Sequence, residues 1–345
     1  MIEVKTCARL HLGLLDTSGE QGRLYGSIGL AVNRPRLLLR AETAPSLVVE
    51  GLETGRVTIY ARRFIDHFGL STGAHLNLLA SIPAHVGLGS GTQIALAVGT
   101  ALARLAGLPV STEEIALAAG RGVRSGIGIA AFQHGGFILD GGHGVSNLPD
   151  AARSAEKAGN KRVPPILVRH PVPKEWHFVT AIPGTGQGIS GEKEDKAFSR
   201  LPESSPEIAE KVSWLILMKM LPAVVENDIA GFGQAMTRIQ QIVGDCFASV
   251  QGGRFSNPIS GKLIGFLLEK GAAGAGQSSW GPAVYGLVLG KGPARQLMRD
   301  VRIFLTDLGG GDVFCVQPQN RGAIIKDSGE RVAVSEGAPL VARGN

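Results

Sequence analysis

The chain has 345 residues, 44% of them hydrophobic and 19% charged, which indicates a folded protein of about two domains and excludes a disordered chain. Its net charge is +6, but the basic residues are spread along the chain and aromatic residues account for only 5%, so nucleic-acid binding is not expected. No apolar stretch has the length of a membrane span, no signal-peptide pattern is present and the three cysteines are isolated, so we expect a cytoplasmic protein that binds no membrane.

The N-terminal half begins with alternating polar and apolar residues, a pattern typical of paired strands. Strands are predicted at residues 3–12, 24–32, 37–41 and 74–80. Residues 92–106 are apolar on nearly every helical face and lead to Gly107, which predicts a buried helix that ends there. Ser111 and Glu114 form a capping box, which predicts a second helix through Ala119.

Glycine and polar residues dominate the middle of the chain. Residues 126–144 are rich in glycine and are predicted to form a loop followed by a strand at residues 136–139. Residues 149–165 are polar, charged and flanked by prolines. They are therefore the best candidate for a domain boundary or a long surface loop.

The C-terminal half alternates strands with helices. Strands are predicted at residues 176–182, 283–289 and 313–316, and helices at residues 205–220, 223–243, 258–270 and 293–308. Residues 274–281 form a second predicted Gly-rich loop. This order predicts an α+β layer in which helices cover one face of an antiparallel sheet. We expect domains at residues 1–160 and 161–320, followed by a polar tail at residues 321–345.

The most informative segment joins the strand at residues 74–80 to the helix that follows. It reads Gly87-Leu88-Gly89-Ser90-Gly91-Thr92, with two glycines around a leucine and hydroxyl residues where the helix begins. The free N–H groups of such a turn and the positive end of the helix dipole converge on one point, and glycine lets an anion approach the backbone. The segment predicts a phosphate-binding loop, with an ordinary tight turn as the alternative.

Several charged side chains are candidates for a site, each with a structural alternative. Arg9 and His11 alternate with leucines in the first predicted strand and share one face, which is either a solvated face or a functional one. Asp16 lies in a turn, where it either caps the turn or contacts a metal or a ribose. Asp140, after a strand, and Glu192, in a polar loop, are candidate Mg²⁺ ligands. The structural alternative for Asp140 is an ordinary turn residue, and for Glu192 it is one charge in a solvated charged segment.

Further candidates follow the predicted helix after Ser111 and lie in the second Gly-rich loop. Arg121 and Arg124, next to Ser125, either compensate the dipole at the end of that helix or bind a substrate carboxylate. Trp280, in the loop at residues 274–281, either stacks on an aromatic substrate or packs in the core.

Three segments, in their order along the chain, resemble the motifs of the GHMP kinase superfamily. Its phosphate loop reads Pro-x-x-x-Gly-Leu-Gly-Ser-Ser, which residues 83–90 match, while Gly91 replaces the second serine. The other two segments are residues 6–16 and 274–281. The resemblance implies a two-domain α/β protein with a ribosomal-S5-like N-terminal domain, a ferredoxin-like α+β C-terminal domain and a site between them.

The chain departs from these kinases at two positions that matter chemically. Many of the kinases carry a catalytic aspartate in a Ser-Gly-Ile-Asp sequence, whereas this chain has Gly128 after Ser125-Gly126-Ile127, and glycine cannot act as a base. At Gly91 it also lacks a hydroxyl that resembles a metal-contacting group in the kinases. Both departures argue against ATP-dependent phosphoryl transfer.

The same segments look like the β-ribofuranosylaminobenzene 5'-phosphate synthase family, in residues 9–16, 87–93, 121–143 and 276–282. That resemblance implies condensation of phosphoribosyl pyrophosphate with 4-aminobenzoate or 4-hydroxybenzoate, with loss of CO₂ and pyrophosphate, in tetrahydromethanopterin biosynthesis. It also implies Mg²⁺, no organic cofactor and a homodimer. The alternatives are an ATP-dependent GHMP small-molecule kinase and a non-catalytic homologue that binds a phosphorylated ligand.

The resemblance extends to individual residues. Arg9, His11 and Asp16 are expected to be catalytic, and Asp140 and Glu192 remain the metal candidates. The residues expected to bind phosphate or substrate are Gly87, Leu88, Gly89, Ser90, Gly91, Thr92, Arg121, Arg124, Ser125, Gly276, Gln277, Ser278, Ser279 and Trp280.

Overall fold

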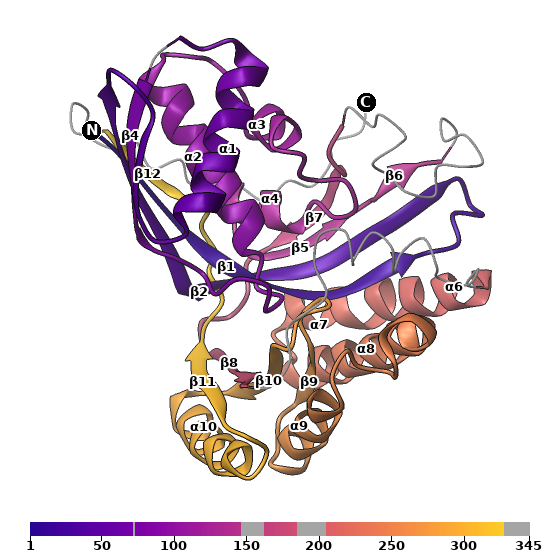
Figure 1. Ribbon diagram of the computed structural model, residues 1–345. Coiled ribbons are helices and arrows are strands. Elements are labelled where there is room, and N and C mark those ends of the chain that lie inside the picture. Colours follow the sequence, from indigo (N-terminus) through magenta and orange to yellow (C-terminus); the bar gives the residue numbers. More distant parts are fainter. Residues whose placement is uncertain (72, 146–161, 185–204, 328–345) are drawn as a thin grey trace.

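The computed structural model describes residues 1–71, 73–145, 162–184 and 205–327 of the chain. This part consists of two sheets and the helices that cover their faces (Figure 1). None of its helices is long and apolar enough to cross a membrane.

The larger sheet is built on two long antiparallel strands, β1 (Ile2–Asp16) and β2 (Arg23–Ala44). β2 is long enough to pair with different strands at its two ends: β4 (Gly73–Ala80) at one, and β5 (Phe137–Asp140) and β6 (His143–Gly144) at the other. The edges are completed by β3 (Val48–Gly51) beside β4, β7 (Ile166–His170) beside β5 and β12 (Ile324–Asp327) beside β1. This sheet therefore takes in one strand beyond the expected boundary at residue 160 and another from the expected tail.

Helices pack on both faces of the larger sheet (Figure 1). One face carries α1 (Thr54–Phe68), α2 (Ser90–Leu105), α3 (Thr112–Ala118) and α4 (Ile127–Gln133). Against the other lie α6 (Pro206–Leu215), the π-helical segment η1 (Ile216–Met220), α7 (Leu221–Glu226) and α8 (Ile229–Gln251). Because both faces are covered, β1 is buried on both, so the polar His11 and the apolar Leu10 and Leu12 all lie inside.

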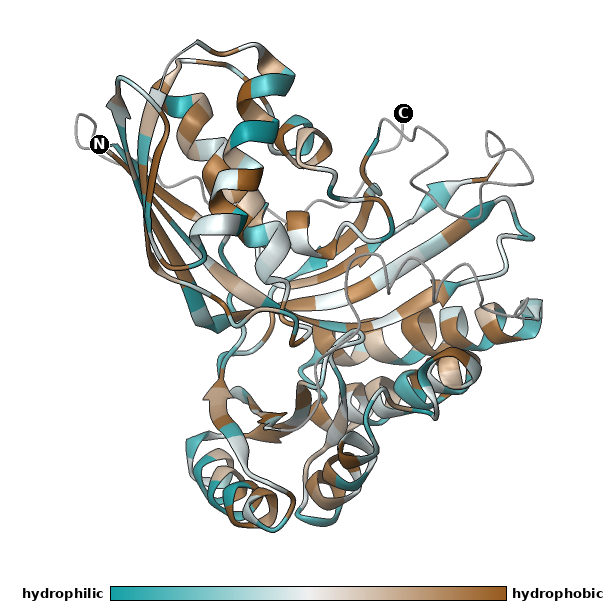
Figure 2. Cartoon of the chain, in the orientation of Figure 1, coloured by the Kyte–Doolittle hydropathy of each residue, from teal (hydrophilic) through white to brown (hydrophobic). Residues whose placement is uncertain are grey.

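The smaller sheet is antiparallel, in the order β11 (Gly311–Val316), β8 (Trp176–Pro183), β10 (Val284–Leu289) and β9 (Gly274–Gln277). α9 (Pro258–Glu269) and α10 (Lys291–Thr306) cover one face with an apolar cluster that includes Leu267 and Val301. Strands and helices follow one another in the ferredoxin-like β-α-β-β-α-β order. Figure 2 shows apolar residues along the strands of both sheets.

One aromatic residue of α8 joins the two sheets into a common core. The ring of Phe232 lies 5.0 Å from that of Trp176 in the smaller sheet and 5.7 Å from that of Phe137 in the larger one. All three side chains are fully buried. α8 thus forms the layer between the sheets, and its C-terminal half reaches the region of the phosphate loop.

Most predicted strands and helices are confirmed, with shifted ends, but two of the predicted loops are wrong. Residues 274–277 form strand β9 and not a loop, because pairing with β10 imposes an extended backbone on Gly-Ala-Gly-Gln. The predicted loop after Gly126 contains α4, whose residues are buried between the larger sheet and its neighbours. The expected polar tail begins with a strand, β12, that pairs with β1.

α1 was not predicted, although it leaves a pattern in the sequence. Val57, Tyr60, Ala61 and Phe64 are buried at helical spacing. No side chain caps its first turn, because Glu53 is in the left-handed conformation and makes no capping hydrogen bond. The missing cap signal made the helix hard to recognise.

Candidate active site

A cavity of about 460 Å³ lies where β1, the start of α2 and the segment after β9 meet. The first turns of α1, residues 120–125 and the C-terminal half of α8 complete its lining. Elements of both sheet layers therefore line this cavity, which lies where the family resemblance implies a site.

The lining of the cavity is strongly cationic. It contains Arg9, Arg56, Arg121, Arg124 and Arg254, and no aspartate or glutamate is found among the described residues that line it. Two of these arginines have acidic partners outside the lining, Arg254 with Asp245 (2.7 Å) and Arg56 with Glu53 (3.4 Å). The cavity is suited to a ligand that carries several negative charges.

The predicted phosphate loop forms one wall. Gly87 (φ 87°) and Gly89 (φ 83°) are left-handed, and no side chain caps the N-terminus of α2. A side chain at residue 87 would collide with the carbonyl oxygen of Ser278, so the approach of the C-terminal segment also requires glycine there. The open end of a 16-residue helix supplies N–H donors and a positive dipole to the cavity.

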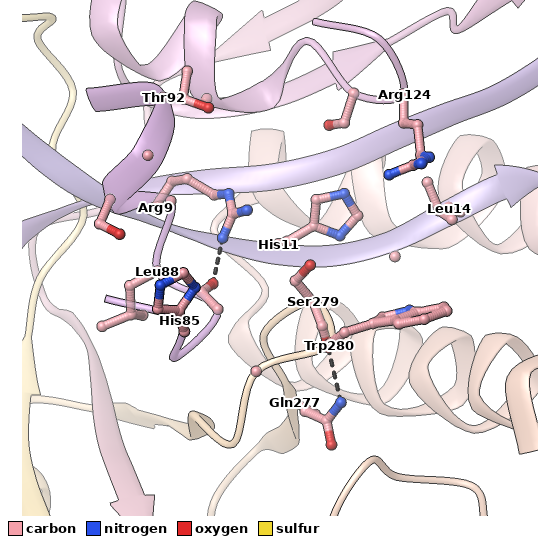
Figure 3. A pocket seen from close by; sticks show the side chains of 18 of the residues that line it. Arg9, His11, Leu14, His85, Leu88, Thr92, Arg124, Gln277, Ser279 and Trp280 are labelled. Atoms are coloured by element: carbon pink, nitrogen blue, oxygen red, sulfur yellow. Dashed lines mark hydrogen bonds between the residues drawn. The ribbon is translucent and has the colours of Figure 1, made fainter. Parts of the chain in front are cut away.

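Arg9 and His11 both line the cavity, as their alternation in the strand predicted (Figure 3). Irregularities in the pairing of β1 with β2 lie on either side of them, between Cys7 and Arg9 and between His11 and Gly13. Such bulges redirect side chains. The Arg9 guanidinium donates a hydrogen bond to the carbonyl oxygen of Gly87, which ties β1 to the phosphate loop.

His11 is almost completely buried, with 9% of its surface exposed. Burial, together with the charge of Arg9, lowers the pKa of its imidazole to about 3. The ring is therefore neutral at neutral pH. It can exchange hydrogen bonds with a ligand but brings no positive charge to the site.

Ser278 and Gln277, both expected to bind substrate, connect the walls of the cavity through hydrogen bonds. The Ser278 hydroxyl is fully buried, accepts a hydrogen bond from the His11 backbone N–H (3.0 Å) and donates one to the Gly87 carbonyl (2.7 Å). The Gln277 amide donates to the Ser279 carbonyl (2.8 Å) and accepts from the Ser256 backbone N–H (3.0 Å). Ser278 and Gly276 lie outside the lining, whereas Gln277 and Ser279 are part of it.

Trp280 and Phe247 form an aromatic wall. Their rings pack edge to face with centroids 5.1 Å apart, in an apolar cluster that also contains Leu14. All three residues line the cavity, and Figure 3 shows Leu14 and Trp280 on the far side of His11 from Thr92. Trp280 packs in an apolar cluster and also lines the cavity, so stacking on a substrate ring stays a prediction.

α1 adds two site residues that the sequence analysis missed, Arg56 and Tyr60. The Arg56 guanidinium donates to the Ser90 hydroxyl (3.2 Å), and the Arg121 guanidinium donates to the Tyr60 hydroxyl and lies 5.2 Å from the centre of its ring. Recognition of the helical spacing in residues 57–64 would have placed Arg56 and Tyr60 on adjacent turns. Nothing in the sequence shows that both face the start of α2.

Asp16 does not line this cavity, and the position of Glu192 is not described. Asp16 lies outside the lining and caps its own turn, accepting hydrogen bonds from the backbone N–H of Ser18 (2.6 Å) and Gly19 (3.3 Å). Glu192 lies outside the described residues. In the described part of the chain, no three acidic, histidine or cysteine side chains form a metal-binding group. Among the described residues that line the cavity none offers a carboxylate, so these residues by themselves do not fit a protein-held Mg²⁺.

The contacts of Asp140 match the structural alternative to a metal ligand. Its side chain is fully buried outside the lining and accepts hydrogen bonds from the backbone N–H groups of Gly126 (2.8 Å) and Gly142 (3.0 Å). Burial raises the pKa of this carboxyl to about 6. Asp140 thereby fixes the end of the segment that presents Arg121 and Arg124 to the cavity.

The position at which kinases often carry an aspartate is filled by a neighbour. A Cβ on Gly128 would lie 3.1 Å from the Thr92 methyl carbon, and the Gln93 side chain donates a hydrogen bond to the Gly128 carbonyl (2.8 Å). A side chain at residue 128 would therefore require Thr92, in the first turn of α2, to move.

Comparison with known proteins gives the family. The model described as GHMP kinases N terminal domain matches residues 56–136, and the GHMP kinases C terminal model matches residues 220–307. A beta-ribofuranosylphenol 5'-phosphate synthase of Methanothermobacter thermautotrophicus is 35% identical, over 93% of this chain and 98% of the relative. A protein of the same name from Archaeoglobus fulgidus is 39% identical, over 83% of this chain and 88% of the relative.

Solved structures confirm the predicted fold. Homoserine kinase from Cytophaga hutchinsonii has a TM-score of 0.64 at 18% identity, with 94% of this chain and 97% of that chain covered. Mevalonate kinase of Methanococcus jannaschii has a TM-score of 0.63 at 13% identity, with 93% and 98% covered. At these identities the similarity shows a shared GHMP-kinase fold and nothing about the reaction.

Proposed function

The chain belongs to the beta-ribofuranosylphenol 5'-phosphate synthase family, and from this membership we propose that it condenses phosphoribosyl pyrophosphate with 4-hydroxybenzoate or 4-aminobenzoate. CO₂ and pyrophosphate leave, and the product enters tetrahydromethanopterin biosynthesis. The protein is thus an enzyme, a decarboxylating phosphoribosyltransferase. The relatives' name specifies a phenol, which 4-hydroxybenzoate becomes when it loses its carboxylate, so this acceptor is the first to test.

The observation that supports this function is the cavity lined by five arginines, with no carboxylate among its described residues. Both substrates are anions, because the donor carries a phosphate and a diphosphate and the acceptor carries a carboxylate. Guanidinium groups bind phosphate and carboxylate oxygens through paired hydrogen bonds. The wall of Trp280, Phe247 and Leu14 offers an apolar surface for the acceptor ring.

The reaction suits a site without a general base. The bond between ribose C1 and the diphosphate oxygen breaks, and its electron pair leaves with pyrophosphate. C1 then accepts an electron pair from the ring carbon that bears the carboxylate. The bond from that carbon to the carboxylate breaks next, returns its pair to the ring and releases CO₂. No proton is gained or lost overall, so the absence of a carboxylate at Gly128 does not hinder the reaction.

The cationic lining serves the step in which negative charge grows on the leaving group. Hydrogen-bond donors that are already oriented stabilise such a charge without reorganising during the reaction. Arg9 is oriented by the Gly87 carbonyl, and Arg56 by Ser90 and Glu53. Neutral His11 and the hydroxyl of Ser279 remain as hydrogen-bonding groups of the lining.

The kinase alternative fits the same cavity less well. Phosphoryl transfer from ATP uses groups that orient the acceptor hydroxyl and hold metal ions on the phosphates. Here Gly128 packs against Thr92, and Gly91 provides no hydroxyl where the kinase loop has its second serine. The arrangement favours binding of an anion over activation of an alcohol.

Magnesium, a homodimer and a cytoplasmic location remain predictions from the family resemblance. The described lining residues offer a divalent cation no carboxylate, so such a cation would depend on the oxygens of the diphosphate. Activity measured over a range of Mg²⁺ and chelator concentrations, and the mass of the protein in solution, test the first two.

One assay separates the candidate functions. The protein is incubated with phosphoribosyl pyrophosphate, Mg²⁺ and 4-hydroxybenzoate or 4-aminobenzoate labelled in the carboxyl carbon. We expect labelled CO₂ and pyrophosphate to appear in equal amounts. If neither acceptor yields CO₂, the synthase function is wrong. Consumption of ATP with an alcohol acceptor would then support a kinase, and ligand binding without turnover would support a binding protein.

A further inference from the structure

Gly91 lies beside two guanidinium groups from different parts of the chain. A Cβ on this residue would lie 2.9 Å from Arg121 Nη2 and 3.2 Å from Arg56 Nη2. Arg56 comes from α1 and Arg121 from the segment after α3, so α1, α2 and this segment meet at one point of the cavity lining. The second serine of the kinase loop would stand here, and in this chain two cations take up the space around that position.

Both guanidinium groups are held in place by neighbouring side chains and line the cavity. Arg56 Nη1 pairs with Glu53 (3.4 Å), and its Nη2 donates to the Ser90 hydroxyl (3.2 Å). The Arg121 guanidinium donates to the Tyr60 hydroxyl and lies over that ring. Both arginines still belong to the lining, with Tyr60 and Ser90 beside them. Preorganised guanidinium groups lose little conformational freedom when a ligand binds.

The charge at this point suits the most highly charged group of the substrates. The electrostatic potential at this point is positive. It is raised by the two guanidinium groups and by the open N-terminus of α2, and no carboxylate among the described lining residues lowers it. Of the three anionic groups on the two substrates, the diphosphate carries the most charge. It also gains charge when the bond to C1 breaks, so cations placed here would act mainly on the transition state.

We propose that Arg56 and Arg121, packed against Gly91, form the subsite for the diphosphate of the donor and stabilise its departure. This inference rests on the proposed function. Gly91 is the residue that makes the subsite possible, because any side chain there would push one or both guanidinium ends out of place. The acceptor ring is left to the aromatic wall of Trp280 and Phe247.

A purely structural role for these arginines is the competing explanation, and Gly91→Ala separates the two. The substitution keeps both arginines, Ser90 and Tyr60, and alanine is a better helix former than glycine, so α2 should fold as before. The added methyl group displaces only the ends of flexible side chains. Gly265→Ala is the matched control, because Gly265 is a helical glycine of α9 with nothing within 4 Å of the added carbon.

The test is calorimetric titration with inorganic pyrophosphate, which needs no turnover. Arg56→Gln, Arg121→Gln and Gly91→Ala should each weaken pyrophosphate binding on the order of 10-fold or more, as expected for the loss of charge-assisted hydrogen bonds. Gly265→Ala should bind as the wild type does. The affinity for 4-hydroxybenzoate and the melting temperature of Gly91→Ala should stay unchanged. Inorganic phosphate should bind the wild type more weakly than pyrophosphate does.

Each failure has a distinct signature. Unchanged pyrophosphate affinity in the two arginine variants would overturn the subsite even if the enzyme releases CO₂. Equal binding of phosphate and pyrophosphate would assign the arginines to a monophosphate and overturn it as well. Weakened pyrophosphate binding in a protein that never releases CO₂ would support the subsite and refute the proposed reaction. If the arginine variants do not fold, Gly91→Ala decides the outcome.

Discussion

Replacing Asp140 by asparagine tests how the buried carboxylate behind the arginine segment contributes to stability. Asp140 has no exposed surface, and burial outweighs its hydrogen bonds to Gly126 and Gly142, so its pKa rises from 3.8 to about 6. With about 1.4 kcal/mol for each pH unit between the folded and unfolded values, ionising Asp140 costs the folded state about 3 kcal/mol.

The sign of the pH dependence follows from the direction of this change. Because the folded pKa lies above the unfolded one, the stabilising contribution of the protonated carboxyl is complete below about pH 4 and is lost as the pH rises through about 6. Asparagine stays uncharged throughout. The free energy of unfolding of the wild type should therefore fall by about 3 kcal/mol relative to Asp140→Asn between pH 4 and pH 7.5.

Urea unfolding of both proteins at closely spaced pH values measures this difference, in which the titration of all other groups cancels. Asp307→Asn, at an exposed position after α10, controls for the substitution itself. A difference between wild type and Asp140→Asn that does not change with pH would refute the reasoning, since the backbone donors would then compensate fully for burial. We also expect slower turnover of Asp140→Asn, because an asparagine NH₂ would face a backbone N–H and loosen the segment that carries Arg121.

Three further substitutions test the cavity. Arg9→Ala should lower kcat by about 100-fold, the effect of removing one oriented hydrogen-bond donor from the charge-stabilising site of other enzymes. The control Arg295→Ala, on the exposed face of α10, should leave the rate unchanged. Ser90→Ala should raise the KM for phosphoribosyl pyrophosphate by about 5-fold, the value of one hydrogen bond, and an unchanged KM would remove Ser90 from the site. Gly128→Asp should destabilise the protein by about 1–3 kcal/mol through overpacking against Thr92, measured by thermal unfolding, and should not phosphorylate an alcohol. ATP-dependent turnover in that variant would show that the missing aspartate alone separates this chain from the kinases.

Features that depend on short stretches of sequence could be predicted reliably. Two glycines and the hydroxyl residues after them indicated an anion loop at the start of a helix, because left-handed turns and open helix ends are local properties. The alternation of Arg9 and His11 placed both side chains on one face of a strand for the same reason. Gly91 and Gly128 likewise showed in the sequence that two kinase groups are missing.

What each polar residue does was decided by tertiary packing. Asp140 and Ser278 have the chemistry of ligand-binding residues, but both are fully buried outside the cavity lining and hydrogen-bonded to backbone groups elsewhere in the chain. No local pattern carries that information, because the partner of Ser278 on the phosphate loop lies 191 residues away. A side chain acquires its role from its surroundings as well as from its chemistry.

The sequence by itself determined the fold and the family and predicted a phosphate loop, because short motifs and the order of strands and helices specify them. Only the tertiary structure brought Arg56 of α1 and Arg121 of the segment after α3 together beside Gly91 of α2, and only there did the lining emerge as cationic and without described carboxylates. The physical reason is that the electrostatic potential in a cavity is the sum of contributions from residues distant in the chain. The packing of the two layers decides which of these charged groups line the cavity.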